Sequence, residues 1–298
     1  MKTERIYLNK KQSAWIDQYI LDDSIGYKLQ RSWPVMIIVP GGAYLTVATR
    51  EGEAVALEYL KMGYSCFVLH YAPYIADRET GQRDEQAHYP SQEIYLMETL
   101  HIIHQNADKW HLDDKQIFAT GFSAGAHIVG MVATRLNDPY YISKLSFIPS
   151  NDELRLKGIV LCYPMLNGDN HSDFMQSDDP NIQKLREDVD VALYGHNDPT
   201  QGEIDELDLI NYISKDCCPV FLWHTTDDKV VPSICSTELI HKLQSYSIPC
   251  EYHLFRKGVH GLSTMNKSYS HLGEKDNLHL KSWITLVEYW LEEIREEG

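Results

Sequence analysis

The sequence of 298 residues is poor in basic side chains and has no long apolar run. It carries 27 Lys and Arg against 43 Asp and Glu, which gives a formal net charge of −16. Such a surface repels phosphate backbones and anionic membranes, so we expect neither a nucleic-acid nor a membrane partner. No apolar stretch is long enough to cross a bilayer, and no basic segment followed by an apolar one opens the chain. We therefore expect a cytoplasmic protein.

Motifs that hold metals or cofactors are also absent from the sequence. It contains no HExxH, no HxxEH and no Cys/His cluster, and no GxGxxG follows an early strand. The cysteines show no CxxC spacing; they are Cys66, Cys162, Cys217, Cys218, Cys235 and Cys250. We interpret the adjacent pair Cys217 and Cys218 as two half-buried thiols rather than a redox pair. The expected chemistry needs no metal and no cofactor.

Short apolar runs alternate with longer stretches of helical periodicity. The runs cover residues 35–40, 65–71, 116–121, 158–164, 219–225 and 250–255. The helical stretches cover residues 50–63, 91–110, 124–136, 233–246 and 277–297. Nearly continuous hydrophobicity is typical of parallel strands that are buried on both faces. The alternation predicts one α/β domain over residues 1–298, with helices on both faces of a mostly parallel sheet.

Two further features complete this predicted architecture. ERIYL and AWIDQYIL near the N-terminus predict an antiparallel pair at the sheet edge, for a total of about eight strands. Residues 74–90 and 165–216 are polar and aperiodic. Long insertions at the loop end of such a sheet border the ligand site, so we predict that 165–216 forms a small cap insertion.

The segment ATGFSAGAH, residues 119–127, contains the pattern G-x-S-x-G around Ser123. It follows a predicted strand and precedes a predicted helix, which is the context of a nucleophile elbow. There the serine hydroxyl stands exposed on a sharp turn, and the helix N-terminus directs N–H groups toward developing negative charge. The pattern predicts that Ser123 is a catalytic nucleophile.

The turn PGGAY, residues 40–44, follows the first predicted parallel strand. Hydrolases with a nucleophile elbow use a glycine-rich turn at this point, whose N–H groups bind the carbonyl oxygen of the substrate. Together with the N–H of the residue after the nucleophile, it predicts an oxyanion hole. The expected donors are the N–H groups of Gly42, Ala43 and Ala124.

A serine nucleophile on this fold requires an acid and then a histidine later in the chain. Asp227 and Asp228 follow one predicted strand, and His260 lies between glycines after the next. We predict that His260 takes the Ser123 proton and that one of the two aspartates orients its imidazole. Other histidines are interpreted as packing or surface residues; they include His101, His104, His111, His127, His224 and His253.

These segments together resemble the α/β-hydrolases of the esterase and lipase superfamily, in the bacterial acetylxylan-esterase-like or sugar-ester hydrolase branch. The resemblance runs from PGGAY through GFSAGAH and FLWHTTDDKVVP to GVHGLS. It implies an α/β-hydrolase fold and a catalytic triad of Ser123, Asp228 and His260, because the family's acid stands four residues before the proline, here Pro232. Ala43 replaces a glycine of many relatives, and since alanine disfavours positive φ, we expect an ordinary backbone there.

The resemblance implies a serine esterase, that is a carboxylesterase acting on small-molecule esters through an acyl-enzyme. Short acyl groups are expected, with acetyl esters of sugars as one candidate, and Tyr74, Tyr89, Phe174 and Tyr194 could stack on a sugar. Two alternatives stay open: an amidase or peptidase with the same triad, and a non-catalytic ligand-binding member of the fold. A homodimer is also left open.

Overall fold

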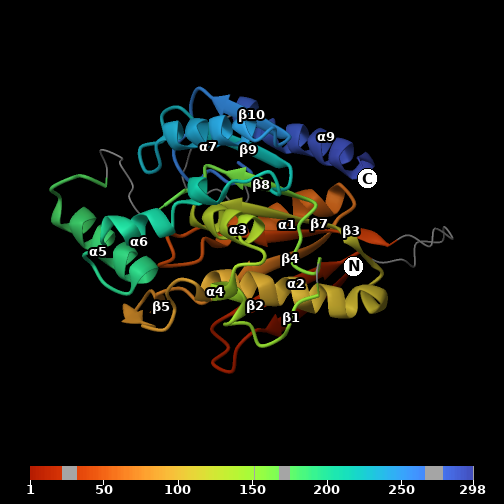
Figure 1. Cartoon of the computed structure of the whole chain (residues 1–298), viewed down its shortest axis with the longest axis horizontal. Coiled ribbons are helices and arrows are strands. Elements are labelled where there is room, and N and C mark those ends of the chain that lie inside the picture. The colour runs from red at the N-terminus through yellow and green to blue at the C-terminus, as the bar shows by residue number, and fades with distance from the viewer. Residues whose placement is uncertain (22–31, 151, 168–174, 266–277, 298) are drawn as a thin grey trace.

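The molecule is built around an eight-stranded sheet (Figure 1). The structure is a computed structural model that describes residues 1–21, 32–150, 152–167, 175–265 and 278–297. The strands are, in spatial order, β1 (Lys2–Tyr7), β2 (Trp15–Ile20), β4 (Ser65–His70), β3 (Trp33–Val39), β7 (Leu112–Phe122), β8 (Gly158–Cys162), β9 (Val220–Thr225) and β10 (Cys250–Phe255). From β4 to β10 all neighbours are parallel, whereas β1 and β2 form an antiparallel pair at one edge. The predicted α/β-hydrolase architecture is confirmed.

Helices cover both faces of the sheet. On one face lie α2 (Ser91–Trp110), α3 (Ala124–Thr134) and α7 (Ser233–Ser245), and on the other α1 (Glu53–Lys61) and α9 (Trp283–Glu296). Alternate residues of β3 enter the two cores: Val35 and Ile37 face the α2 side, and Met36 and Ile38 face the α1 side. A strand buried on both faces requires this continuous apolar run. Within the described residues, no helix is long and apolar enough to span a membrane.

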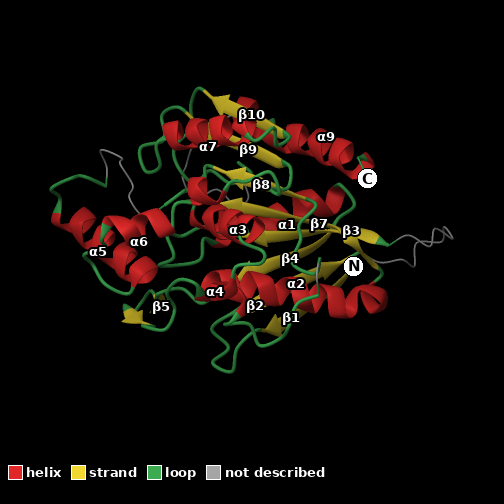
Figure 2. Cartoon of the chain, viewed as in Figure 1, coloured by secondary structure: helices red, strands yellow, loops and turns green. Residues whose placement is uncertain are grey.

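The two polar insertions lie beyond the carboxyl ends of the parallel strands (Figure 2). The first forms the hairpin β5 (Ile75–Asp77) and β6 (Gln82–Arg83), and the second contains α5 (Pro180–Tyr194), α6 (Gln201–Glu206) and the 3-10 turn η2 (Leu209–Tyr212). They contact each other: Arg83 Nη2 lies 2.9 Å from Asp188 Oδ1, and Tyr89 N donates to Ala192 O at 3.1 Å. The remaining short helices are η1 (Thr49–Glu51), α4 (Pro139–Ile142) and α8 (Leu278–Lys281).

The aromatic side chains of these insertions are not arranged for sugar stacking as we expected. Tyr74 is 6% exposed and Tyr89 is 8% exposed, and both pack into the core on the α2 side. Tyr194 is only partly exposed and packs against the same core, and Phe174 lies outside the described residues. The stacking prediction is wrong for Tyr74 and Tyr89, because both rings pack into the core, and that of Tyr89 lies against Tyr140 and Tyr141.

At Gly125, α3 packs closely against the end of β3, and this contact allows a prediction about stability. A Cβ on this residue would lie 2.1 Å from Val39 O and 2.5 Å from Pro40 O, which are backbone atoms that cannot turn aside. Because overpacking a core costs roughly 1–3 kcal/mol and sometimes more, we expect Gly125→Ala to lower the free energy of unfolding by about 3 kcal/mol or more. Urea denaturation measures this change.

Gly202 in α6 is the matched control. A Cβ there would meet only Thr200 Oγ1, at 4.0 Å. Replacing a helical glycine by alanine stabilises by roughly 0.5–1 kcal/mol where space allows, so Gly202→Ala should unfold at slightly higher urea. Equal midpoints for the two variants would contradict the close-approach argument.

Candidate active site

Ser123 occupies a sharp turn between β7 and α3. Its backbone has φ 51° and ψ −117°, a conformation that a residue with a side chain adopts only when its surroundings impose it. The flanking glycines allow the turn, because a Cβ on Gly121 would lie 2.4 Å from Gly125 O. Ser123 N also donates to Cys162 O at 3.0 Å, which fixes the turn to the end of β8. The sequence pattern thus forms a strand–turn–helix elbow.

The structure brings Ser123, His260 and Asp228 together in one line of hydrogen bonds. His260 Nε2 lies 2.9 Å from Ser123 Oγ, and His260 Nδ1 lies 2.7 Å from Asp228 Oδ2. Asp228 follows β9 and His260 follows β10, so all three side chains stand at the carboxyl edge of the sheet. In this arrangement the imidazole can accept the serine proton while the carboxylate holds its Nδ1–H.

Asp228 is buried and surrounded by donors. Its Oδ1 accepts the N–H groups of Val230 at 2.9 Å and Val231 at 3.0 Å. Burial alone would raise the pKa of Asp228, but hydrogen bonds from His224 and His260 outweigh burial and hold this pKa well below its usual value. The carboxylate therefore stays charged over the whole range in which a histidine titrates.

Asp227 points away from the triad and holds the histidine loop instead. Its Oδ1 accepts the N–H of Gly258 at 2.6 Å, two residues before His260. On the other side of that histidine, the carbonyl of Gly261 accepts from Arg50 Nε at 2.7 Å. The two adjacent aspartates therefore have different environments. Strand alternation is not the reason, because β9 ends at Thr225 and residues 226–227 form a turn.

The PGGAY turn lies directly against the elbow. A Cβ on Gly41 would come 2.6 Å from Phe122 O, and Gly42 has φ 130°, so both positions require glycine. Our expectation of an ordinary backbone at Ala43 is wrong, because Ala43 has φ 56° and Tyr44 has φ 61°. Burial of the Tyr44 ring and hydrogen bonds from Leu45 N and Thr46 N to Gly42 O at 3.0 Å each maintain this left-handed turn.

The three predicted oxyanion donors are available in this arrangement. Within the described part of the chain, the N–H groups of Gly42, Ala43 and Ala124 have no protein acceptor. Ala124 is also the first residue of α3, where the helix dipole favours negative charge. Unpaired N–H groups beside a nucleophile can stabilise the oxyanion of an acyl-transfer intermediate.

Sequence analysis missed a brace formed by Glu51 and Tyr163. Glu51 is 1% exposed; its Oε2 accepts Gly41 N–H at 2.8 Å, and its Oε1 accepts the Tyr163 hydroxyl at 2.8 Å. Tyr163 in turn accepts from Ser263 N at 3.1 Å, and its ring stands edge-on to His260 with centroids 5.0 Å apart. This brace connects the PGGAY turn to the histidine loop. No sequence pattern links a glutamate and a tyrosine so far apart.

A second missed residue is His224, which we had interpreted as packing. It is fully buried in β9; its Nε2 faces two acceptors, Asp228 Oδ2 at 3.2 Å and Val231 O at 3.0 Å. That nitrogen must therefore carry the proton, while Nδ1 contacts Ser236 Oγ at 2.7 Å. His224 therefore contacts the same oxygen, Asp228 Oδ2, as His260 does. The spacing of four residues between His224 and Asp228 was the available signal.

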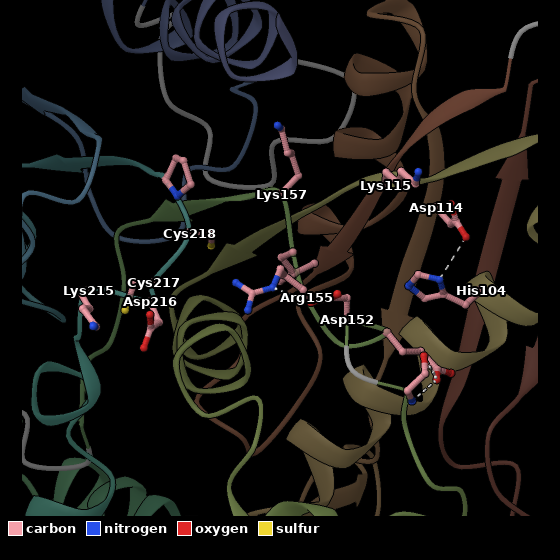
Figure 3. A pocket seen from close by; sticks show the side chains of 14 residues that line it. His104, Asp114, Lys115, Asp152, Arg155, Lys157, Lys215, Asp216, Cys217 and Cys218 are labelled. Atoms are coloured by element: carbon pink, nitrogen blue, oxygen red, sulfur yellow. Dashed lines mark hydrogen bonds and ion pairs between the residues drawn. The ribbon is translucent and has the colours of Figure 1, made fainter. Parts of the chain in front are cut away.

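A cavity of about 720 Å³ lies at the opposite edge of the sheet, near the amino ends of β7, β8 and β9 (Figure 3). Its charged groups are mixed and partly paired: His104 Nδ1 lies 3.6 Å from Asp114 Oδ2, and Arg155 Nε lies 3.3 Å from Asp152 Oδ1. Ligand sites of open α/β sheets form at the carboxyl edge, so the candidate active site is the group of Ser123, His260 and Asp228 and not this cavity. The described residues bring no three metal-ligating side chains together.

Comparisons with known proteins agree with the fold of the chain. The model of the BD-FAE family matches residues 21–243. Endo-1,4-beta-xylanase B of Butyrivibrio fibrisolvens is 28% identical over 78% of the chain, but the match spans only 33% of that protein's length. A sugar hydrolase of Lactococcus lactis superposes with a TM-score of 0.72 at 25% identity, covering 99% of both chains. An acetyl ester-xyloside bifunctional hydrolase of Caldicellulosiruptor lactoaceticus superposes with a TM-score of 0.72 at 27% identity. The match covers 98% of this chain and 96% of that one.

The contrast between the two aspartates yields a prediction. Asp228→Asn removes the charge beside His260 and favours the wrong imidazole tautomer, so kcat for a nitrophenyl ester should fall by up to about 10⁴-fold. Asp227→Asn keeps an oxygen that can accept the Gly258 N–H, and we expect a loss below about tenfold. Steady-state kinetics of the two variants decide the matter, and the reverse order would make Asp227 the acid.

Proposed function

This chain belongs to the BD-FAE family, and on that premise we propose that it is a carboxylic ester hydrolase acting through an acyl-enzyme on Ser123. The observation that carries the proposal is the line of hydrogen bonds from Ser123 through His260 to Asp228, with distances of 2.9 and 2.7 Å. Three unpaired N–H groups beside Ser123 support it, because ester cleavage develops negative charge on the carbonyl oxygen.

The proposed reaction proceeds in two halves. His260 Nε2 takes the Ser123 proton as Oγ attacks the ester carbonyl, and the oxyanion accepts hydrogen bonds from Gly42, Ala43 and Ala124. The tetrahedral intermediate collapses; the C–O bond to the alcohol breaks, and the alcohol leaves with the proton from His260. Water then attacks the acyl-enzyme by the same steps and releases the acid.

We further propose that the substrates carry short acyl groups, with acetylated sugars as the candidate class. The support is similarity: one solved relative at 27% identity is named an acetyl ester-xyloside hydrolase. The insertion over residues 165–216 would act as the cap that selects the alcohol part, since its helices α5 and α6 lie beyond the carboxyl ends of the strands.

A cytoplasmic location is part of the proposal. All six cysteines are free thiols, as in proteins of reducing compartments. A homodimer stays a prediction from the sequence.

The nucleophile is tested by Ser123→Ala. Loss of the hydroxyl should lower kcat for nitrophenyl acetate by roughly 10⁴–10⁶-fold, leaving the residual rate that the oxyanion donors provide. Ser245→Ala, at the exposed end of α7, is the control and should leave kcat unchanged. If folded Ser123→Ala retains wild-type turnover, the nucleophile is elsewhere. Wild-type cleavage of a nitroanilide faster than the matching ester would instead make the enzyme an amidase.

Acyl-chain length tests the substrate class. We expect kcat/KM for acetate esters to exceed that for decanoate esters by about tenfold or more, because a pocket that fits a short acyl group cannot hold ten carbons without steric overlap, which costs roughly 1–3 kcal/mol. A series of nitrophenyl esters from two to ten carbons measures this. A rising rate with chain length would indicate a lipase-like pocket and contradict the proposal.

A further inference from the structure

A buried polar cluster lies beneath the PGGAY turn, on the face of the sheet covered by α2 and α3. It consists of Tyr44 from the turn, Glu93 in the first turn of α2 and His127 in α3, and each is 0% exposed. The Tyr44 hydroxyl lies 2.7 Å from Glu93 Oε1 and 2.7 Å from His127 Nδ1. His127 Nε2 lies 2.7 Å from the carbonyl oxygen of Leu207.

Counting protons in this cluster shows that one more is needed than the usual charge states supply. The Leu207 carbonyl can only accept, so His127 Nε2 carries a proton and Nδ1 is bare in the neutral ring. Tyr44 has one hydroxyl proton but two neighbours. If Glu93 were ionised and His127 neutral, one of the two 2.7 Å contacts would join two lone pairs. An additional proton must therefore reside on Glu93 or on His127.

The environment assigns this proton to Glu93. Burial raises the pKa of Glu93 to about 7, and burial lowers the pKa of His127 to about 4. The Arg135 charge lowers both values and so does not favour the imidazolium. Glu93 Oε2 is buried and has no hydrogen-bond partner among the described residues, which is far less costly for a neutral acid than for a carboxylate.

Other titratable groups around the cluster do not change this assignment. Arg135 is already paired, with Asp138, and it donates to the Tyr89 hydroxyl at 2.8 Å. Burial raises the pKa of each neighbouring phenol, so these groups stay neutral; they are Tyr71, Tyr89, Tyr140 and Tyr141. The nearby acidic side chains are Glu51, facing Tyr71, and Glu206, facing Tyr89 and Tyr140. Neither carboxylate is among the groups that shift the pKa of Glu93.

The cluster controls a strained part of the site. Tyr44 follows Ala43, and both residues have positive φ, a conformation that persists only when surrounding contacts impose it. We infer that Glu93 is protonated in the active enzyme and, through its hydrogen bond to Tyr44 and that of Tyr44 to His127, positions the turn that presents the Gly42 and Ala43 N–H groups. Glu93 is a positioning residue, and this role rests on the proposed function. Loss of its proton leaves a repulsive contact at Tyr44 and displaces the oxyanion donors.

The first test is the pH dependence of kcat in Glu93→Gln. The side-chain amide of this variant can donate to the Tyr44 hydroxyl at every pH, whereas the Glu93 side chain can donate only when it is protonated. We expect wild-type kcat to fall about tenfold or more between pH 6 and pH 9, with little change in KM, because oxyanion donors act on the transition state. Glu93→Gln should lose this alkaline decline, and Glu93→Leu should have a kcat at least about tenfold lower at pH 6. An identical decline in wild type and Glu93→Gln overturns the inference.

Glu58→Gln is the matched control. Glu58 is also buried, but it lies in α1 on the other face of the sheet and pairs with Lys61. This variant should keep the wild-type decline. A flattened profile in Glu58→Gln would show that the decline does not arise from Glu93 and would contradict the inference.

A second test needs no turnover. Because the pKa of Glu93 is higher in the folded than in the unfolded state, its stabilising effect is complete below its unfolded pKa and is lost as pH rises through about 7. The Tm of wild type should therefore fall between pH 5 and pH 8 relative to that of Glu93→Gln. Parallel Tm curves would overturn the inference. If the Tm curves diverge but the wild type cleaves no ester, the proposed function is refuted and a protonated Glu93 is still supported.

Discussion

The contact between Gly125 and the carboxyl end of β3 is the constraint on which the rest of the site depends. With only hydrogen at this position, the first turn of α3 lies against Val39 and Pro40, where a Cβ would be 2.1 Å from a carbonyl oxygen. Gly41 makes the reciprocal approach to the backbone of Phe122. The elbow serine and the oxyanion turn are therefore positioned by main-chain contacts, which need no side-chain ordering when a substrate binds.

The PGGAY turn is supported from both faces of the sheet. Glu51, next to the α1 layer, accepts hydrogen bonds from Gly41 N and the Tyr163 hydroxyl, whereas Glu93, in the α2 layer, meets the Tyr44 hydroxyl. Between these two supports the backbone takes positive φ, which costs on the order of 1–3 kcal/mol per residue. A buried glutamate on each side thus adds to the hydrogen bonds within the turn, which has alanine and not a third glycine at residue 43.

The sequence was sufficient to predict the sheet, because parallel strands buried on both faces must be apolar throughout and here they alternate with stretches of helical periodicity. It was also sufficient to propose Ser123 and His260, since each follows a strand, whereas the choice of Asp228 over Asp227 came from the family resemblance. It failed at Ala43, where tertiary contacts override the backbone preference of the residue, and at Tyr74, whose ring packs into the core although its segment is polar. Roles such as those of Glu51 and His224 depend on contacts between distant elements, which periodicity cannot encode.

The separation of the site residues along the chain has a consequence for folding. The hydrogen bond between Ser123 and His260 joins positions 137 residues apart, and that between Arg50 and Gly261 joins positions 211 apart. Contacts between residues so far apart in sequence form late, because the entropy cost of closing the long loop precedes the stabilisation by the contact. Strands β3, β4 and β7 can pair early, but Ser123, the proposed nucleophile, has no contact with His260, its proposed base, until β10 has docked beside β9. A folding intermediate that lacks the C-terminal strands would hold a complete serine elbow and be chemically inert.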